Sequence, residues 1–248
     1  MNLIYKILAW LCGYPMNLYV TRHGESHRNH GLSTTQTGLF FDTEEQFTQW
    51  GLDADQYVPL TEQGLLQARA AGATFIGSVI RFGIMPSVII HSGYQRAFST
   101  AQEFVDCVCR AGYPYIELVE NFSIRERESG ITHVLLAHEV ESLMTWNKRY
   151  WSCVGPVHAR PWSGESLIEM REGRIRTFLD RGLKKYAGQS VVVVCHGRVM
   201  QTMHMELLGM SLSQMEAYMK EPSPKNCEIR HYRFDWRTRR MVYVGVVV

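Results

Sequence analysis

The fold of this 248-residue chain is constrained most by two apolar runs, each of which leads into a histidine followed by a glycine. The run 18–20 precedes Arg22-His23-Gly24-Glu25, and the valine run 191–194 precedes Cys195-His196-Gly197. Short apolar runs bounded in this way are typical of buried strands. In an α/β sheet, ligands bind beyond the carboxyl ends of the strands. We therefore expect the two histidines, far apart in the chain, to meet in one pocket.

Strands and helices are predicted to alternate along the rest of the chain. The expected strands are 17–21, 87–91, 115–119, 191–195, 229–234 and 241–248. The expected helices are 62–82, 94–110, 166–186 and 198–208. A long polar segment, called here the polar excursion, occupies 31–59. This alternation favours a mostly parallel central sheet with helices on both faces. We therefore predict an α/β fold, a three-layer αβα sandwich whose strand-end loops share one edge.

Composition excludes several classes of protein. Hydrophobic residues make up 46% of the chain and charged residues 20%, as in an ordinary globular domain. The formal charge of +2 gives no reason to expect a nucleic-acid partner. The six cysteines show no CxxC spacing and indicate reduced thiols. We expect a cytoplasmic protein, for which a homodimer is one option.

Residues 1–15 are interpreted separately from the domain at 16–248. They are largely apolar, carry one lysine, Lys6, and end at Pro15. The stretch is too short to cross a bilayer, so no transmembrane segment is expected. A short N-terminal extension is the favoured interpretation, and an amphipathic membrane-surface anchor is the alternative.

The expected strand-end loops carry charged side chains suited to phosphate. Arg22 and His23 follow the first strand, Arg96 begins the helix after the second, and Glu126 and His196 follow later strands. Guanidinium groups bind phosphate oxygens bidentately, and the backbone at Gly197, where a helix begins, could add N–H donors. A neutral imidazole can attack phosphorus, and a carboxylic acid can protonate the leaving oxygen.

At this point the chain resembles the histidine phosphatase superfamily, also called the phosphoglycerate mutase-like family, over roughly 16–248. The segments that carry the resemblance are Arg22-His23-Gly24-Glu25-Ser26 with Asn29, Leu60-Thr61-Glu62-Gln63-Gly64, Ser92-Gly93-Tyr94-Gln95-Arg96-Ala97, Arg125-Glu126-Arg127, Gly164-Glu165-Ser166 and Cys195-His196-Gly197. The resemblance implies a central mixed sheet flanked by helices.

The resemblance also implies a role for each matching residue. His23 would be the phosphorylated nucleophile, with Arg22, Arg96 and His196 forming the phosphate pocket and Asn29 supporting it. Glu126 would be the general acid and base, and Glu128 is the rival candidate. No metal and no organic cofactor are expected. The partner would be a small phosphorylated substrate.

Three functions remain open from the sequence. A phosphomonoester hydrolase is favoured, because Arg198 stands where mutases usually carry a small polar residue, and Lys148-Arg149 replaces their arginine pair. The alternatives are a phosphoglycerate mutase-type transfer and a catalytically inactive, phosphate-ligand-binding regulatory protein. An aromatic-rich insert at about 131–162 is expected to form a helical cap over the sheet edge, lining the mouth or packing a small core of its own.

Overall fold

The computed structural model describes residues 3–34, 55–80, 83–130, 145–146 and 149–247, with the single positions 45 and 48. Within them, six strands form one sheet in the order β3-β2-β4-β1-β5-β6. The strands are β1 (Asn17–Arg22), β2 (Val88–His91), β3 (Glu117–Glu120), β4 (Ser190–Cys195), β5 (Ile229–Asp235) and β6 (Arg240–Val246). Only β5 runs against its neighbours, so the predicted mostly parallel sheet is confirmed.

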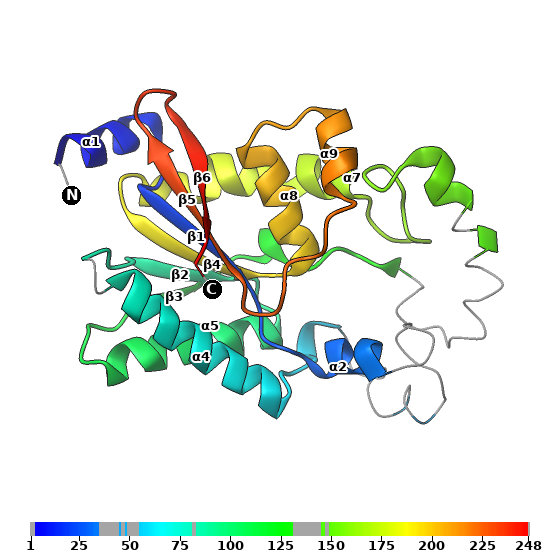
Figure 1. Cartoon of the computed structure of the whole chain (residues 1–248), viewed down its shortest axis with the longest axis horizontal. Helices are drawn as coiled ribbons and strands as arrows, with labels where there is room; N and C mark the ends of the chain where they lie inside the picture. The colour runs from blue at the N-terminus through cyan, green and yellow to red at the C-terminus, as the bar shows by residue number, and fades with distance from the viewer. Residues whose placement is uncertain are drawn as a thin grey trace.

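Helices cover both faces of this sheet (Figure 1). One face carries α4 (Glu62–Ser78) and α5 (Gln95–Arg110), and the other carries α7 (Leu167–Met170), α8 (Gly197–Leu207) and α9 (Leu212–Tyr218). The central strands are buried on both sides: Val191 and Val193 pack into one apolar core, Val192 and Val194 into the other. The three-layer αβα sandwich is therefore confirmed.

Several predicted boundaries differ from the structure. The helix expected at 62–82 begins at Glu62 but ends at Ser78, and residues 81–82 lie outside the described part. The helix expected at 166–186 contains two π-helical stretches, Arg171–Ile175 and Phe178–Gly182, which side-chain periodicity does not distinguish from α-helix. Of the proposed insert at 131–162, residues 131–144 and 147–148 lie outside the description, and 149–154 are helical.

Within the described part of the domain at 16–248, the α-helices α2 (His27–Thr34) and α9 were not predicted. Helix α2 is polar and contains a glycine, so no apolar periodicity indicates it. The ion pair between Arg28 and Asp55, 2.7 Å long, ties it to a distant segment. Helix α9 does carry a local signal, since Ser211 and Gln214 form a capping box.

Residues 3–14 pack against the domain. Helix α1 (Leu3–Cys12) buries Ala9 in the core, and the Gly188 N–H donates to the carbonyl of Tyr14 at 2.8 Å. Leu3, Trp10 and Leu11 are exposed. None of the described helices combines the length and the hydrophobicity that a bilayer span requires. Whether α1 is a plain extension or a surface anchor stays a prediction.

The loop after β1 and the first turn of α4 are joined by backbone packing at two glycines. A Cβ on Gly64 would lie 2.0 Å from the carbonyl oxygen of Glu25, and one on Gly24 would lie 2.4 Å from the carbonyl oxygen of Gly64. Thr61 caps α4 and also donates its hydroxyl to the Glu25 carboxylate at 2.8 Å. The position of the loop that carries His23 therefore depends on the absence of side chains at both glycines.

The variant Gly64→Ala is expected to lower the free energy of unfolding by about 1–3 kcal/mol, the usual cost of overpacking. Gly77→Ala is the matched control, because it lies in the same helix and a Cβ there meets nothing within 4 Å. The control should be neutral or stabilising by up to about 1 kcal/mol, since alanine favours helix. Urea denaturation measures both, and equal effects would contradict the packing argument.

Candidate active site

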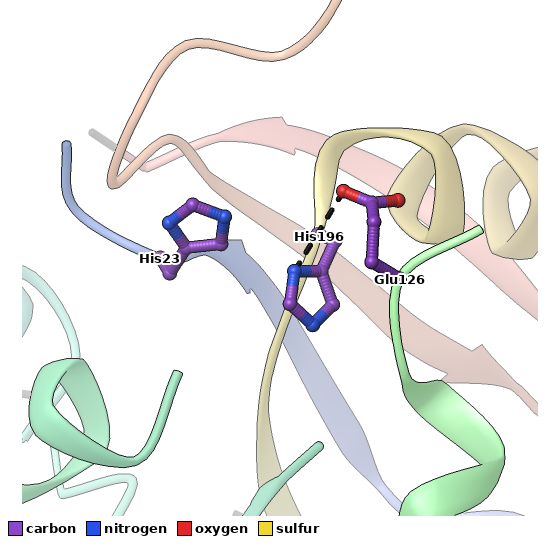
Figure 2. Close-up of side chains that lie close together, drawn as sticks. All are labelled: His23, Glu126 and His196. Carbon is purple, nitrogen blue, oxygen red and sulfur yellow. Dashed lines mark ion pairs between the residues drawn. The ribbon is translucent and has the colours of Figure 1, made fainter. Parts of the chain in front are cut away.

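Pairing of β1 with β4 places the two histidines next to each other. The parallel register sets Arg22 opposite Cys195, so His23 and His196 both follow at the carboxyl ends of neighbouring strands. Their ring centroids are 5.1 Å apart, and both side chains are buried. Figure 2 shows His196 between His23 and Glu126. The predicted meeting of the two histidines is confirmed.

The contacts of His23 define which nitrogen carries its proton. Nδ1 lies 2.6 Å from the carbonyl oxygen of Gly24, which can only accept, so Nδ1 is the protonated nitrogen. Nε2 is then unprotonated, and its lone pair accepts a hydrogen bond from Arg96 Nε at 3.3 Å. The imidazole therefore presents an unprotonated nitrogen beside a guanidinium group.

His196 is held by groups from two other strand ends. Its Nε2 is 2.8 Å from the hydroxyl of Ser92, which follows β2. Its Nδ1 is buried, has no hydrogen-bond partner among the described residues and lies 3.7 Å from Oε2 of Glu126, which follows β3 (Figure 2). The sheet edge thus collects side chains from β1, β2, β3 and β4.

Arg96, at the start of α5, is fixed by an acidic partner. Its Nη2 lies 3.1 Å from a carboxylate oxygen of Asp55, and its Nη1 donates to the backbone carbonyl of Asp55. The other carboxylate oxygen of Asp55 binds Arg28 at 2.7 Å. These bonds hold the guanidinium so that its Nε faces His23.

Arg22 and the start of α8 form another side of the candidate site. Arg22 donates through Nη1 to the carbonyl of Pro224 at 2.8 Å, while its buried Nε has no hydrogen-bond partner among the described residues. A Cβ on Gly197 would lie 3.7 Å from that Nε. No side chain caps α8 at His196, so its first N–H groups remain available to an anion.

All seven predicted site residues except His196 line one cavity of about 270 Å³. His196 lies directly beneath, against both His23 and Glu126. The lining comprises Arg22, His23, Ser26, Arg28, Asn29, Asp55, Arg96, Glu126, Arg127, Ser129, Gly197, Arg198 and Ser223. Asn29 accepts a hydrogen bond from Asn226, which also donates to the backbone carbonyl of His23.

The electrostatics of this cavity favour a bound anion. Burial, followed by the charges of Arg96 and Arg22, holds the pKa of His23 well below its usual range. Burial and the charge of Arg96 lower the pKa of His196 in the same way. Both rings are therefore neutral at neutral pH, and the positive charge of the site comes from arginines.

Glu126 is positioned by a buried arginine behind it. Arg174 donates to the backbone carbonyls of Ser123, Arg125 and Glu126 at 2.7–3.2 Å, and Glu165 binds Arg174 through both carboxylate oxygens. Glu128, the rival acid, is half exposed and pairs with Arg125 instead. It does not line the cavity, so the geometry favours Glu126.

His23, His196 and Glu126 offer ligand atoms within 4.8 Å of one another, a spacing found in metal sites. The set fits a divalent cation poorly. His23 Nε2 already accepts from Arg96, and the nearby guanidinium groups of Arg96 and Arg22 repel positive charge. The same groups attract a phosphoryl anion.

Seven cavity residues did not enter the predicted site: the charged residues Arg28, Asp55, Arg127 and Arg198, and the serines Ser26, Ser129 and Ser223. Asp55 lies in the polar excursion, where no local pattern predicts a contact. Arg127 and Arg198 each directly follow a predicted site residue, and that adjacency was the available signal. Trp151, in the proposed cap, lies with its ring 5.8 Å from the Arg127 guanidinium, so this part of the insert adjoins the cavity.

A family model agrees with the fold and the motifs: residues 18–246 match the histidine phosphatase superfamily (branch 1), and the chain belongs to this superfamily. A 2,3-bisphosphoglycerate-dependent phosphoglycerate mutase from Gloeobacter violaceus is 26% identical over 206 residues, covering 80% of this chain and 78% of the relative. Phosphoserine phosphatase 1 from Hydrogenobacter thermophilus is 28% identical over 131 residues, covering 53% and 58%. The relatives thus include both mutases and phosphatases.

The fold also matches solved structures. Mycobacterial glucosyl-3-phosphoglycerate phosphatase superposes with a TM-score of 0.65 at 18% identity, over 94% of this chain and 98% of that one. At this identity the similarity establishes the shared α/β architecture alone.

The lowered histidine pKa values predict a pH-dependent stability. The unfolded chain protonates its histidines near pH 6.5, whereas folded His196 stays neutral, so acid favours the unfolded state below pH 6.5. His196→Asn should reduce the slope of the unfolding free energy between pH 6.5 and 5 by about 1 kcal/mol per pH unit. His204, whose pKa burial lowers to about 4, should behave alike when replaced by asparagine. Urea denaturation at several pH values across this range measures the slope. A slope in the variants equal to that of the wild type would contradict this prediction.

Removal of the Arg174 guanidinium should destabilise the protein strongly. Arg174→Gln leaves the Glu165 carboxylate without its partner and frees the loop that carries Glu126, at a cost of about 3 kcal/mol or more. Arg160→Gln is the control, since it breaks the exposed pair with Glu169 and should cost less than about 1 kcal/mol. Comparable losses of unfolding free energy in the two variants would show that the buried network contributes no more to stability than the exposed pair.

Proposed function

We propose that this protein is a phosphomonoester hydrolase that works through a phosphohistidine intermediate on His23. The observation that carries the proposal is the arrangement of His23, whose Nδ1 is held by the Gly24 carbonyl while its Nε2 faces Arg96 in an arginine-lined cavity. A neutral, oriented imidazole among guanidinium groups suits attack on a dianionic phosphoryl group.

In the first step the lone pair of His23 Nε2 attacks phosphorus, and the bond from phosphorus to the ester oxygen breaks. Arg96 Nε–H would turn from Nε2 to a phosphoryl oxygen as the N–P bond forms. Arg22, His196, Asn29 and the N–H groups at Gly197 would bind the remaining oxygens. Protonated Glu126 would give its proton to the leaving oxygen, so the alcohol departs neutral.

In the second step water attacks the phosphohistidine. The Glu126 carboxylate accepts a proton from this water, the N–P bond breaks, and inorganic phosphate and free His23 are restored. His196 stabilises charge without reacting, since its Nε2 is engaged with Ser92. Glu126 thereby returns to its acid form, and no external co-reactant is required.

A mutase-type transfer is the second candidate, supported by the 26% identity to two bacterial 2,3-bisphosphoglycerate-dependent phosphoglycerate mutases. The same phosphohistidine would then return its phosphoryl group to a hydroxyl of the sugar acid rather than to water. Arg198 at the position of the mutases' small polar residue argues against it. An inactive regulatory protein is disfavoured because His23, Arg22, Arg96, His196 and Glu126 are all present.

The proposal predicts phosphate release from p-nitrophenyl phosphate that depends on His23. His23→Ala should lower kcat by about 10³-fold or more, as for loss of a nucleophile, whereas His158→Ala, at an exposed histidine away from the cavity, should retain activity. Brief incubation with labelled substrate should give an acid-labile, base-stable phosphoprotein in the wild type only. Absence of His23-dependent release from a broad panel of phosphomonoesters would overturn the proposal. Conversion of 3-phosphoglycerate to its 2-isomer without free phosphate would select the mutase.

A further inference from the structure

Three arginines that line the cavity are not used by the proposed chemistry: Arg28, which pairs with Asp55, and the two arginines Arg127 and Arg198. Arg127 follows Glu126 in the loop after β3, and Arg198 is the second residue of α8. Both line the same cavity as His23. They lie close enough to interact as like charges, and burial together with the charge of Arg198 lowers the pKa of Arg127 to about 10. Both remain cations at neutral pH.

The guanidinium of Arg127 has no direct acidic partner among the described residues, and only the more distant charges of Glu126 and Glu165 act on it. Among the described residues it makes no hydrogen bond or ion pair, and its Nε is buried without a partner. Glu126 meets Arg127 through the backbone N–H at 2.8 Å, and the carboxylate of Glu165 is engaged by Arg174. The ring of Trp151 supports the guanidinium from one side at 5.8 Å. A buried cation in this state is costly unless a ligand pairs with it.

Arg198 also keeps most of its donors free. Its Nη1 donates to the side-chain oxygen of Gln201 at 2.9 Å, and no other hydrogen bond of its guanidinium occurs within the described part of the chain. Glu126 and Arg22 both interact electrostatically with it. Two adjacent guanidinium groups with unused donors form a binding site for an anion such as a carboxylate or phosphate.

The position of this pair relates it to the leaving group. The phosphoryl group is proposed to sit at His23, and Glu126 lies beyond His196 on the side away from His23 (Figure 2). Because Glu126 would protonate the leaving oxygen, the alcohol part of the substrate extends toward Glu126. Arg127 lines the same cavity as Glu126 and interacts with it electrostatically, so its guanidinium is available to the alcohol part of the substrate.

We infer that Arg127 and Arg198 bind a second anionic group on the alcohol part of the substrate, so that the substrate class is phosphomonoesters bearing a carboxylate or a further phosphate. This inference rests on the proposed function. It assigns the two arginines to substrate selection, separate from the arginines that hold the transferred phosphoryl group.

Matched substrate pairs test the inference with the full chain. Two pairs test a carboxylate. 3-Phosphoglycerate carries a carboxylate where glycerol 3-phosphate carries a hydroxymethyl group, and O-phosphoserine carries a carboxylate that phosphoethanolamine lacks. The monophosphate and bisphosphate of 1,3-propanediol test a second phosphate. The wild type should prefer the more anionic member by at least tenfold in kcat/KM, either in the carboxylate pairs or in the phosphate pair. The pairs that show the preference identify the anion. Substrate consumption is followed as both phosphate release and isomer formation.

The double variant R127Q/R198Q should reduce that preference to about threefold or less. The ratio within each pair cancels general losses of activity, and circular dichroism checks that the variant folds. R69Q is the charge-matched control, since Arg69 pairs with Glu103 on the surface outside the cavity, and it should keep the wild-type ratio. As an independent binding measure, glycerate but not glycerol should inhibit wild-type hydrolysis of p-nitrophenyl phosphate competitively.

No preference in any pair, or a preference that survives in R127Q/R198Q, would overturn the assignment of the two arginines. In that case p-nitrophenyl phosphate would still be hydrolysed in a His23-dependent way, so the proposed function would stand. Loss of the proposed function would instead appear as no His23-dependent consumption of any phosphomonoester. The two failures are thus distinguished by one set of assays.

Discussion

The parallel pairing of β1 with β4 is the interaction on which the rest of the site depends. Its register sets Arg22 opposite Cys195, and the N–H of His23 donates to the carbonyl of Cys195 at 3.0 Å. A histidine follows the last residue of each strand, so one backbone ladder fixes the separation of both rings. Valine side chains buried on the two faces of β4 hold that ladder in place, because a slip of one residue would exchange its two packing faces.

Around this pair, charge is arranged so that the histidines stay neutral while arginines carry the positive potential. Burial and the charge of Arg96 lower the pKa of both rings. A protonated His23 could not act as a nucleophile, so the same guanidinium groups that would bind a phosphoryl anion also keep the imidazole in its reactive form. Asp55 offsets part of this charge by pairing with Arg28 and Arg96. Arg127 and Arg198 interact electrostatically with Glu126 and add to the positive charge of the cavity.

Most of the residues that the sequence singled out lie together at this sheet edge, and the reason is local. Arg22, His23, Arg96, Glu126 and His196 each stand within a residue or two of a strand end or helix start, or in a family motif, and such signals can be read in a short window. Residues that reach the cavity from irregular segments gave no such signal. Asp55 belongs to a polar excursion, and Arg28 lies on a helix without apolar periodicity. The network of Arg174 with Glu165 and the backbone of Glu126 likewise joins segments that only folding brings together.

The sequence by itself determined the alternation of strands and helices, the two histidine-bearing strand ends and the membership of a superfamily of phosphatases and mutases. Hydrophobic patterning and short motifs suffice for these, because both are encoded by neighbouring residues. Only the tertiary structure decided that Glu126 rather than Glu128 faces the cavity, which nitrogen of His23 is free, and which arginines have counter-charges. These properties depend on distances between groups far apart in the chain. Electrostatic pairing and burial are set by that three-dimensional separation, and sequence order does not contain it.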